Sequence, residues 1–200
     1  MNSKAPLICD TQLPGSTIGM VGGGQLGRMF AVAAAAMGYR VVIFTDAENS
    51  PASQVADQTV VGDLNDQAAI DQFAEQCDVI TLEFENIPAT TIARCRKFAP
   101  TYPSAAVLAT AQDRLIEKTT FHDAGLPVTP FRKVHDSNSL QTAANELGWP
   151  LIIKTARSGY DGKGQIRINA ETNLFEVWEK LGAVECVLEE LLDFKREISI

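Results

Sequence analysis

The first half of the chain alternates between short apolar runs and stretches of helical length. Continuous apolar runs separated by helices are typical of parallel strands that are covered on both faces. The pattern predicts strand 16–21, helix 28–37, strand 40–45, strand 59–61, helix 65–76 and strand 78–84. We therefore expect an α/β fold with a doubly wound parallel sheet, a Rossmann-like domain, over residues 1–103.

The pattern changes after the segment PTYP at residues 100–103, which is our predicted domain boundary. Beyond it, shorter strands flank a glycine-rich turn, which indicates a hairpin and antiparallel pairing. The expected helices are 105–112, 114–124, 137–147 and 172–181, and the expected strands are 131–134, 151–155, 165–168, 186–190 and 197–200. This predicts an α+β domain over residues 104–200. Its last strand has no turn after it, so we expect the domain to be incomplete at its C-terminal end.

Composition excludes several classes of function. The chain has 17 Lys and Arg against 25 Asp and Glu, a net charge of −8 without a basic block, which argues against a nucleic-acid partner. Apolar runs are too short for a bilayer span or a signal peptide, so we expect a cytoplasmic protein with no membrane partner. The four cysteines are widely spaced, which argues against a zinc site or a disulfide framework. Without a GxSxG motif, a hydrolase of the Ser-His type is not indicated.

The first glycine-rich segment begins at Gly22 and ends at Gly27, between a predicted strand and a predicted helix. Its G-x-G-x-x-G form lets an anion approach the helix N-terminus. Asp46 follows the next strand, where dinucleotide-binding proteins place the acid that binds ribose. One interpretation is therefore an NAD(P)-dependent oxidoreductase, and the alternative is that these glycines only pack helix against strand.

The second glycine-rich segment begins at Ser158 and ends at Gln165, shortly after Lys154. It is not a Walker A loop, because no Ser or Thr follows Gly162-Lys163 and no helix comes after it. Glycines around a lysine suit a flap that lays backbone N–H groups and a cation over phosphates. The alternative is an exposed flexible hairpin.

Three further groups of residues are candidates for ligand contacts. The predicted strand 186–190 leads into backbone groups at 190–192 that could read an adenine edge, and Glu197 could accept from ribose hydroxyls; the alternative is that these glutamates are ordinary solvated side chains. Glu83 and Asn86 follow a parallel strand at its carboxyl end, where open α/β sheets bind ligands. Arg114 and Lys118 are four residues apart on one predicted helix face, able to meet a phosphate or to form surface pairs.

Taken together, the motifs resemble the ATP-grasp superfamily and, within it, the 5-(carboxyamino)imidazole ribonucleotide synthetases of purine biosynthesis. The resemblance rests on GGGQLGRM (22–29), TLEFENI (81–87), QDRLIEK (112–118), GYDGKGQ (159–165) and EELLDFKREISI (189–200). One departure is Ser158, where the family usually has glycine. The resemblance implies a pre-ATP-grasp domain followed by part of an ATP-grasp domain, and a first glycine loop that does not bind NAD.

The resemblance also implies an activity. ATP phosphorylates bicarbonate to carboxyphosphate, and the amine of 5-aminoimidazole ribonucleotide then takes the carboxyl group. The implied ATP ligands are Arg114, Lys154, Gly159, Tyr160, Asp161, Gly162, Lys163, Gly164, Gln165, Glu189, Glu190, Leu191, Leu192 and Glu197. Lys154, Tyr160 and Asp161 are the expected catalytic residues, and Gln25, Glu83 and Asn86 the expected substrate ligands.

The family pattern places the Mg²⁺ ligands beyond residue 200, so we expect no metal site here and no turnover by this chain alone. A homodimer is a further expectation. Two rival interpretations remain: the oxidoreductase using Gly22 to Gly27 and Asp46, and a non-catalytic module that senses ATP.

Overall fold

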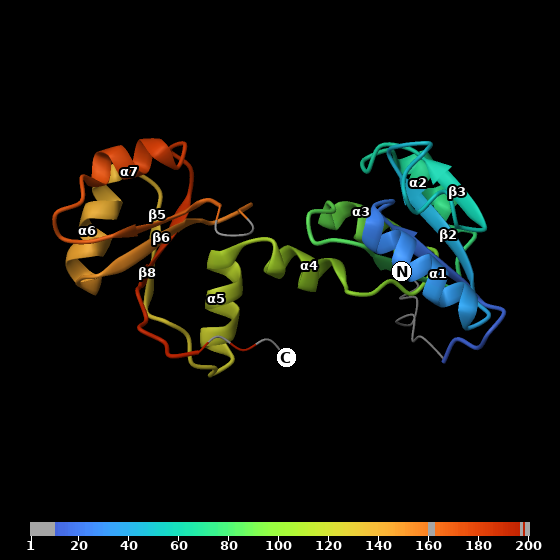
Figure 1. Ribbon diagram of the computed structural model, residues 1–200, viewed down its shortest axis with the longest axis horizontal. Helices are drawn as coiled ribbons and strands as arrows, with labels where there is room; N and C mark the ends of the chain where they lie inside the picture. The colour runs from blue at the N-terminus through green and yellow to red at the C-terminus, as the bar shows by residue number, and fades with distance from the viewer. Residues whose placement is uncertain (1–10, 160–162, 197, 199–200) are drawn as a thin grey trace, which may run out of the picture. The chain divides into compact units, whose positions relative to one another are not determined.

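The computed structural model describes residues 11–159, 163–196 and 198, and the chain divides into two compact units, Met1–Ala109 and Thr110–Ile200 (Figure 1). Each unit has a sheet and a hydrophobic core of its own. The proline-rich segment 100–103 lies inside the first unit. No helix among the described residues is long and apolar enough to cross a membrane.

The sheet of the first unit is parallel and has the strand order β3-β2-β1-β4. Its strands are β1 (Thr17–Val21), β2 (Arg40–Thr45), β3 (Gln58–Val61) and β4 (Val79–Leu82). In the register, Met20 of β1 lies opposite Ile43 of β2 and Thr81 of β4. The parallel sheet expected from the continuous apolar runs is therefore confirmed.

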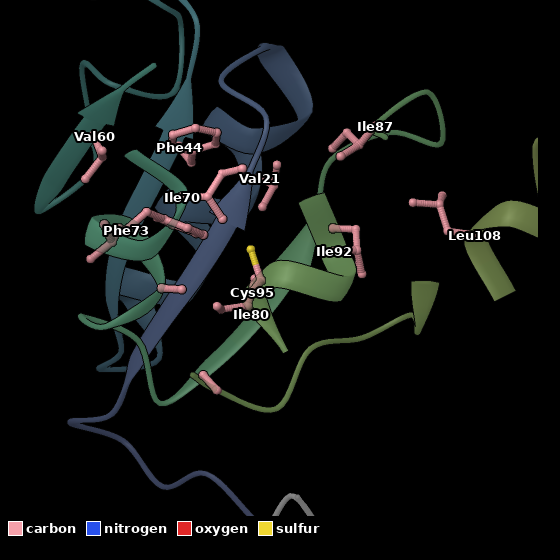
Figure 2. Close-up of a cluster of buried hydrophobic side chains, with 13 residues drawn as sticks. Val21, Phe44, Val60, Ile70, Phe73, Ile80, Ile87, Ile92, Cys95 and Leu108 are labelled. Carbon is pink, nitrogen blue, oxygen red and sulfur yellow. The ribbon is translucent and has the colours of Figure 1, made fainter. Parts of the chain in front are cut away.

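Helices cover both faces of this sheet, which explains why its strands are apolar on both sides. The helices are α1 (Gln25–Ala36), α2 (Gln67–Ala74) and α3 (Ala89–Cys95), and α4 (Ala105–Ala111) begins in this unit and continues past its last residue, Ala109. Val21 packs with α2 and α3 on one face, as Figure 2 shows, whereas its neighbour Met20 packs with α1 on the other. This is the doubly wound arrangement expected from the sequence.

Helix α3 is the element that the sequence pattern did not predict. Its sequence, ATTIARC, is short and rich in β-branched residues, which favour strands over helices. The helix forms because Thr91, Ile92 and Cys95 are buried, and Ile92 and Cys95 join the hydrophobic core of the unit (Figure 2). Tertiary packing therefore overrides a weak local preference here.

The sheet of the second unit is antiparallel and has the strand order β5-β8-β6-β7. Its strands are β5 (Phe131–Val134), β6 (Leu151–Thr155), β7 (Gln165–Ile168) and β8 (Cys186–Glu190), and its helices are α5 (Arg114–Asp123), α6 (Ser137–Leu147) and α7 (Leu174–Lys180). Antiparallel pairing is confirmed. The predicted strand 197–200 falls almost wholly outside the described residues.

The two faces of this sheet carry different side chains. Ile153 and Leu188 lie opposite each other and join α6 and α7 in a buried core. Their neighbours Lys154 and Glu189 point to the other face, because successive side chains in a strand alternate. That second face, which α5 reaches through Lys118, holds the charged groups of the site described below.

Candidate functional site

The glycine loop after β1 already holds an anion of the chain itself. The carboxylate of Glu83, just after β4, accepts hydrogen bonds from Gly24 N–H (2.6 Å) and Gly27 N–H (3.0 Å) at the start of α1. An alanine Cβ at Gly22 would lie 2.6 Å from Glu83 Cβ, so the close approach requires glycine there. Because these N–H groups already have an acceptor, the loop does not offer them to a dinucleotide pyrophosphate.

A cavity of about 540 Å³ opens beside this loop, at the carboxyl edge of the parallel sheet. It is lined by the glycine loop, by Thr45 and Asp46 after β2, and by Glu83 and Phe84 after β4. This is the edge where open α/β sheets bind ligands. Two of the expected substrate ligands are not among the lining residues: Gln25 is exposed, and the side chain of exposed Asn86 donates to Glu85 (3.4 Å).

In the second unit, a buried carboxylate lies between two lysines. Glu189 Oε2 is 3.1 Å from Lys154 Nζ and 3.2 Å from Lys118 Nζ, and the Glu189 side chain is only 5% exposed. Its other oxygen, Oε1, is buried and has no hydrogen-bond partner among the described residues. A buried unsatisfied carboxylate oxygen is costly, so this atom is a strong candidate acceptor for a ligand donor.

The N-terminus of α5 is attached to the loop after β6. Arg114 N–H donates to Ala156 O (2.8 Å), and its guanidinium donates to the carbonyl oxygens of Thr155 (2.9 Å), Ser158 (2.6 Å) and Gly159 (2.6 Å). Arginine suits this role because its planar fork presents several N–H donors at once.

Asp113 strengthens the same junction. Its carboxylate caps α5 by accepting from the N–H groups of Leu115 and Ile116, and it also accepts from Arg157 Nε (3.0 Å). Only 5% of Asp113 is exposed. The sequence pattern gave the helix start but not this second partner, which comes from the loop 44 residues later.

The second glycine-rich loop has backbone conformations that favour glycine. Gly159 and Gly164 have φ of 91° and 71°, and Ser158 has φ of 62°. The left-handed conformation at Ser158 is a physical reason for the glycine that the family usually has there. A cavity of about 630 Å³ borders this loop, lined by Thr155–Gly159, Lys163, Gly164, Val184 and Glu185.

Several expected ligands are only partly placed. Lys163 and Gln165 are exposed, whereas Tyr160, Asp161, Gly162 and Glu197 lie outside the described residues. The N–H groups of Glu190 and Leu191 donate to Pro130 O and Pro150 O, both at 3.1 Å, and Leu192 is exposed. Main-chain recognition of a base by this stretch therefore has to use other groups, such as its carbonyl oxygens.

Within the part of the chain that the structure describes, no cluster of three or more His, Cys, Asp and Glu side chains could hold a metal ion. The charged groups next to Glu189 are the ammonium groups of two lysines. With two lysines and an unpartnered carboxylate oxygen, the site is suited to an anionic ligand that also carries hydrogen-bond donors.

Comparison with known proteins identifies both units. The family model for the ribonucleotide synthetase preATP-grasp domain matches residues 15–112, and that for the ATP-grasp domain matches residues 119–200. A curated relative, the N5-carboxyaminoimidazole ribonucleotide synthase of Staphylococcus aureus (strain COL), is 43% identical over 93% of this chain and 50% of its own length.

Solved structures agree with this match. The N5-carboxyaminoimidazole synthetase from Staphylococcus aureus, complexed with ADP, superposes with a TM-score of 0.85 at 41% identity, covering 92% of this chain and 49% of that one. The N5-carboxyaminoimidazole synthase from Aspergillus clavatus, in complex with ADP and 5-aminoimidazole ribonucleotide, gives 0.78 at 28% identity, covering 91% and 48%.

The chain thus spans about half the length of these synthases. The comparisons give no support to the oxidoreductase interpretation, and the occupied N-terminus of α1 agrees with that result. The chain belongs to the ATP-grasp proteins, with a ribonucleotide synthetase preATP-grasp domain followed by an ATP-grasp domain.

Proposed function

We propose that this chain supplies the ATP site and part of the substrate site of an N5-carboxyaminoimidazole ribonucleotide synthase. In this reaction the γ-phosphoryl group of ATP passes to bicarbonate, which gives ADP and carboxyphosphate. The amine of 5-aminoimidazole ribonucleotide then attacks the carboxyl carbon, and phosphate leaves. The observation that carries the proposal is the cluster of Lys154, Glu189 and the unpartnered Oε1 on one face of the ATP-grasp sheet.

In this proposal the cluster recognises both ends of ATP. Lys154 Nζ provides a positive charge for the phosphates, which phosphoryl transfer requires more than covalent help. Glu189 Oε1 accepts from a donor on the ligand, and the exocyclic amine of adenine is a suitable one. Leu191, Leu192 and Glu197 complete the base and ribose side, as the family resemblance implies.

Arg114 and the second glycine-rich loop form the phosphate cover. The guanidinium of Arg114 donates to three carbonyl oxygens at the start of the loop, the last of them that of Gly159. It therefore fixes the position from which the loop starts. A loop that covers the phosphates also excludes water, and carboxyphosphate decomposes quickly in water. We therefore assign Tyr160 and Asp161 to the bicarbonate side of the site, as a proposal from the family resemblance.

The cavity beside the first glycine loop is the proposed place for the ribonucleotide. The solved relative from Aspergillus clavatus contains 5-aminoimidazole ribonucleotide. In this chain Glu83 lines the cavity, Gln25 is the first residue of α1 and stands between the lining residues Gly24 and Leu26, and Asn86 follows the lining residue Phe84 by two positions. Mg²⁺, a cytoplasmic location and a homodimer complete the proposal.

The proposal can be tested with Lys154→Ala in a protein that joins this chain to the C-terminal half of the Staphylococcus aureus relative. We expect bicarbonate- and aminoimidazole ribonucleotide-dependent ADP release by the unmutated protein, and a loss of about tenfold or more in kcat/KM for ATP in the variant, because a phosphate loses its charged partner. Arg132→Ala is the control, since Arg132 of the same sheet forms an exposed ion pair with Glu146 of α6. Equal kinetics for Lys154→Ala and the unmutated protein would contradict the ATP site.

The two rival interpretations have their own outcomes in this assay. NADH binding by the first unit would support the oxidoreductase interpretation. ATP binding without any ADP release, in the presence of both other substrates, would favour the non-catalytic sensor.

A further inference from the structure

Lys118 is a charged residue that the function proposed above does not use. It lies on α5, and its ammonium is 3.2 Å from Glu189 Oε2, the same oxygen that Lys154 contacts. Only 16% of the Lys118 side chain is exposed, and its ammonium lies 5.7 Å from the centre of the Phe131 ring. Phe131 is opposite Glu189 in the register, so strand β5 and helix α5 hold Lys118 at one place.

We propose that Lys118 is a positioning residue that supplies the counter-charge of Glu189, which leaves the charge of Lys154 available to a phosphate. This inference rests on the proposed ATP site. Lys118 itself does not touch the phosphates in this proposal. It acts through Glu189 and, by way of that carboxylate, through Lys154.

The first step of the argument is the charge of the cluster. Two ammonium groups and one carboxylate give a net charge of +1 at neutral pH. Without Lys118 the remaining pair of Glu189 and Lys154 is neutral, and Lys154 is then the one ion-pair partner that the described residues give this buried carboxylate. An incoming phosphate then has to compete with Glu189 for the same ammonium.

The second step is the position of Glu189. A carboxylate that is almost fully buried needs a partner, because an uncompensated buried charge is strongly unfavourable. Lys118 contacts Oε2, whereas Oε1 has no hydrogen-bond partner among the described residues. Arg167 of β7 shares this face, since it lies opposite Ile152 in the register, and its exposed guanidinium is not an ion-pair partner of Glu189. Lys118 is therefore the residue that can neutralise Glu189 when Lys154 turns to a phosphate.

The third step distinguishes charge from shape. A phosphate group responds to the net charge of the cluster, whereas adenosine, which has no phosphate, does not. The ratio of the two affinities therefore reports on the charge at Lys154 and cancels changes in the pocket for the base.

The experiment measures the binding of ADP and of adenosine to this chain by calorimetry. We expect Lys118→Met to weaken ADP binding about tenfold while adenosine binding changes less than twofold, since one full charge near a partly buried site has an effect of this order. Lys118→Arg should restore most of the ADP affinity. Arg132→Met is the control, because it removes an exposed cation of the same sheet that pairs with Glu146 of α6.

A second variant keeps the test decisive if Lys118→Met unfolds the chain. The double variant Lys118→Met/Glu189→Gln has a cluster charge of +1 again, carried by Lys154 alone. We expect its ratio of ADP to adenosine affinity to return toward that of the unmutated chain, although the absolute affinity for adenosine falls. A purely structural role of Lys118 predicts no such return.

The outcomes separate this inference from the proposed function. If the unmutated chain binds neither ADP nor adenosine, the proposed ATP site is overturned, and the role of Lys118 with it. If ADP binds and its affinity relative to adenosine is the same in Lys118→Met, the ATP site stands and the inference is overturned. If Lys118→Arg is as weak as Lys118→Met, charge is not the property that matters and the inference also fails.

Discussion

At the scale of single residues, Glu83 shows how a side chain far along the chain completes a local structure. It accepts hydrogen bonds from Gly24 and Gly27, 59 and 56 residues earlier. A negative charge at a helix N-terminus is favourable, and here that charge is built into the protein. Its predicted contact with the ribonucleotide stays a prediction, and the structure adds a role in holding the glycine loop.

Glu83→Gln should lower the free energy of unfolding of the first unit by about 1.5–3 kcal/mol, the usual value for hydrogen bonds to a charged group. The glutamine amide is uncharged and has one oxygen, whereas the carboxylate of Glu83 accepts one hydrogen bond with each of its two oxygens. Urea unfolding at neutral pH measures the change. Glu85→Gln is the control, because Glu85 is exposed, and a similar loss in both variants would speak against the capping role.

The cysteines are a second feature at this scale. Burial raises the pKa of the Cys77 and Cys95 thiols to about 12 and that of Cys186 to about 11. All three stay protonated at neutral pH, and the thiolate is the reactive form. They are therefore interior side chains rather than nucleophiles.

We expect these thiols to react slowly with iodoacetamide at pH 8 in the folded chain and rapidly in urea, as peptide mass spectrometry would show. Stability should fall as the pH rises above about 9, because the unfolded thiols lose their protons while the folded ones keep theirs. The loss continues toward pH 12. Rapid labelling of Cys95 without denaturant would contradict this expectation.

At the scale of elements, the junction of α5 with the loop after β6 holds one side of the proposed ATP site. The helix pattern correctly gave α5, and the glycine-rich turn was expected between the strands that form β6 and β7. The positive φ of Gly159 and Gly164 was learned from the structure. The guanidinium of Arg114 and the carboxylate of Asp113 join the two elements across more than 40 residues. The periodicity of apolar positions in the sequence does not predict a contact between residues so far apart.

Arg114→Lys should loosen this junction. A lysine keeps the charge but cannot donate to three carbonyl groups in the fixed geometry of a guanidinium. We expect amide hydrogen exchange at Thr155 and Ala156 to become about tenfold faster, in line with the loss of roughly 1.4 kcal/mol of local stability. Arg132→Lys, which alters an exposed pair with Glu146 on α6, should leave these amides unchanged. Unchanged exchange in Arg114→Lys would show that Arg114 does not hold the loop.

At the scale of the whole molecule, each unit carries one part of the proposed reaction. The first has the cavity at the edge of a parallel sheet, and the second has the charged face of an antiparallel sheet. The chain spans about half the length of the synthases that it matches. Among the described residues, no group of three or more His, Cys, Asp and Glu side chains could hold a metal ion.

We therefore predict that this chain by itself does not release ADP from ATP in the presence of bicarbonate and aminoimidazole ribonucleotide. It should become active when it is joined to the C-terminal half of the Staphylococcus aureus relative. A coupled assay for ADP measures both. Bicarbonate-dependent ADP release by the 200-residue chain would disprove the prediction.

Sequence alone determined the order and type of nearly every strand and helix, because apolar periodicity and glycine positions are local properties of the chain. It also determined the family, through motifs that lie in the same order. Helix α3 was missed because only the core that it covers makes ATTIARC helical.

Tertiary structure alone decided which charges meet. It directed Glu83 to the glycine loop, Arg114 to three carbonyl groups, and both Lys118 and Lys154 to one buried carboxylate. The physical reason is that these contacts join residues far apart in the chain, and their strength depends on burial, which exists only after the sheets and helices have packed.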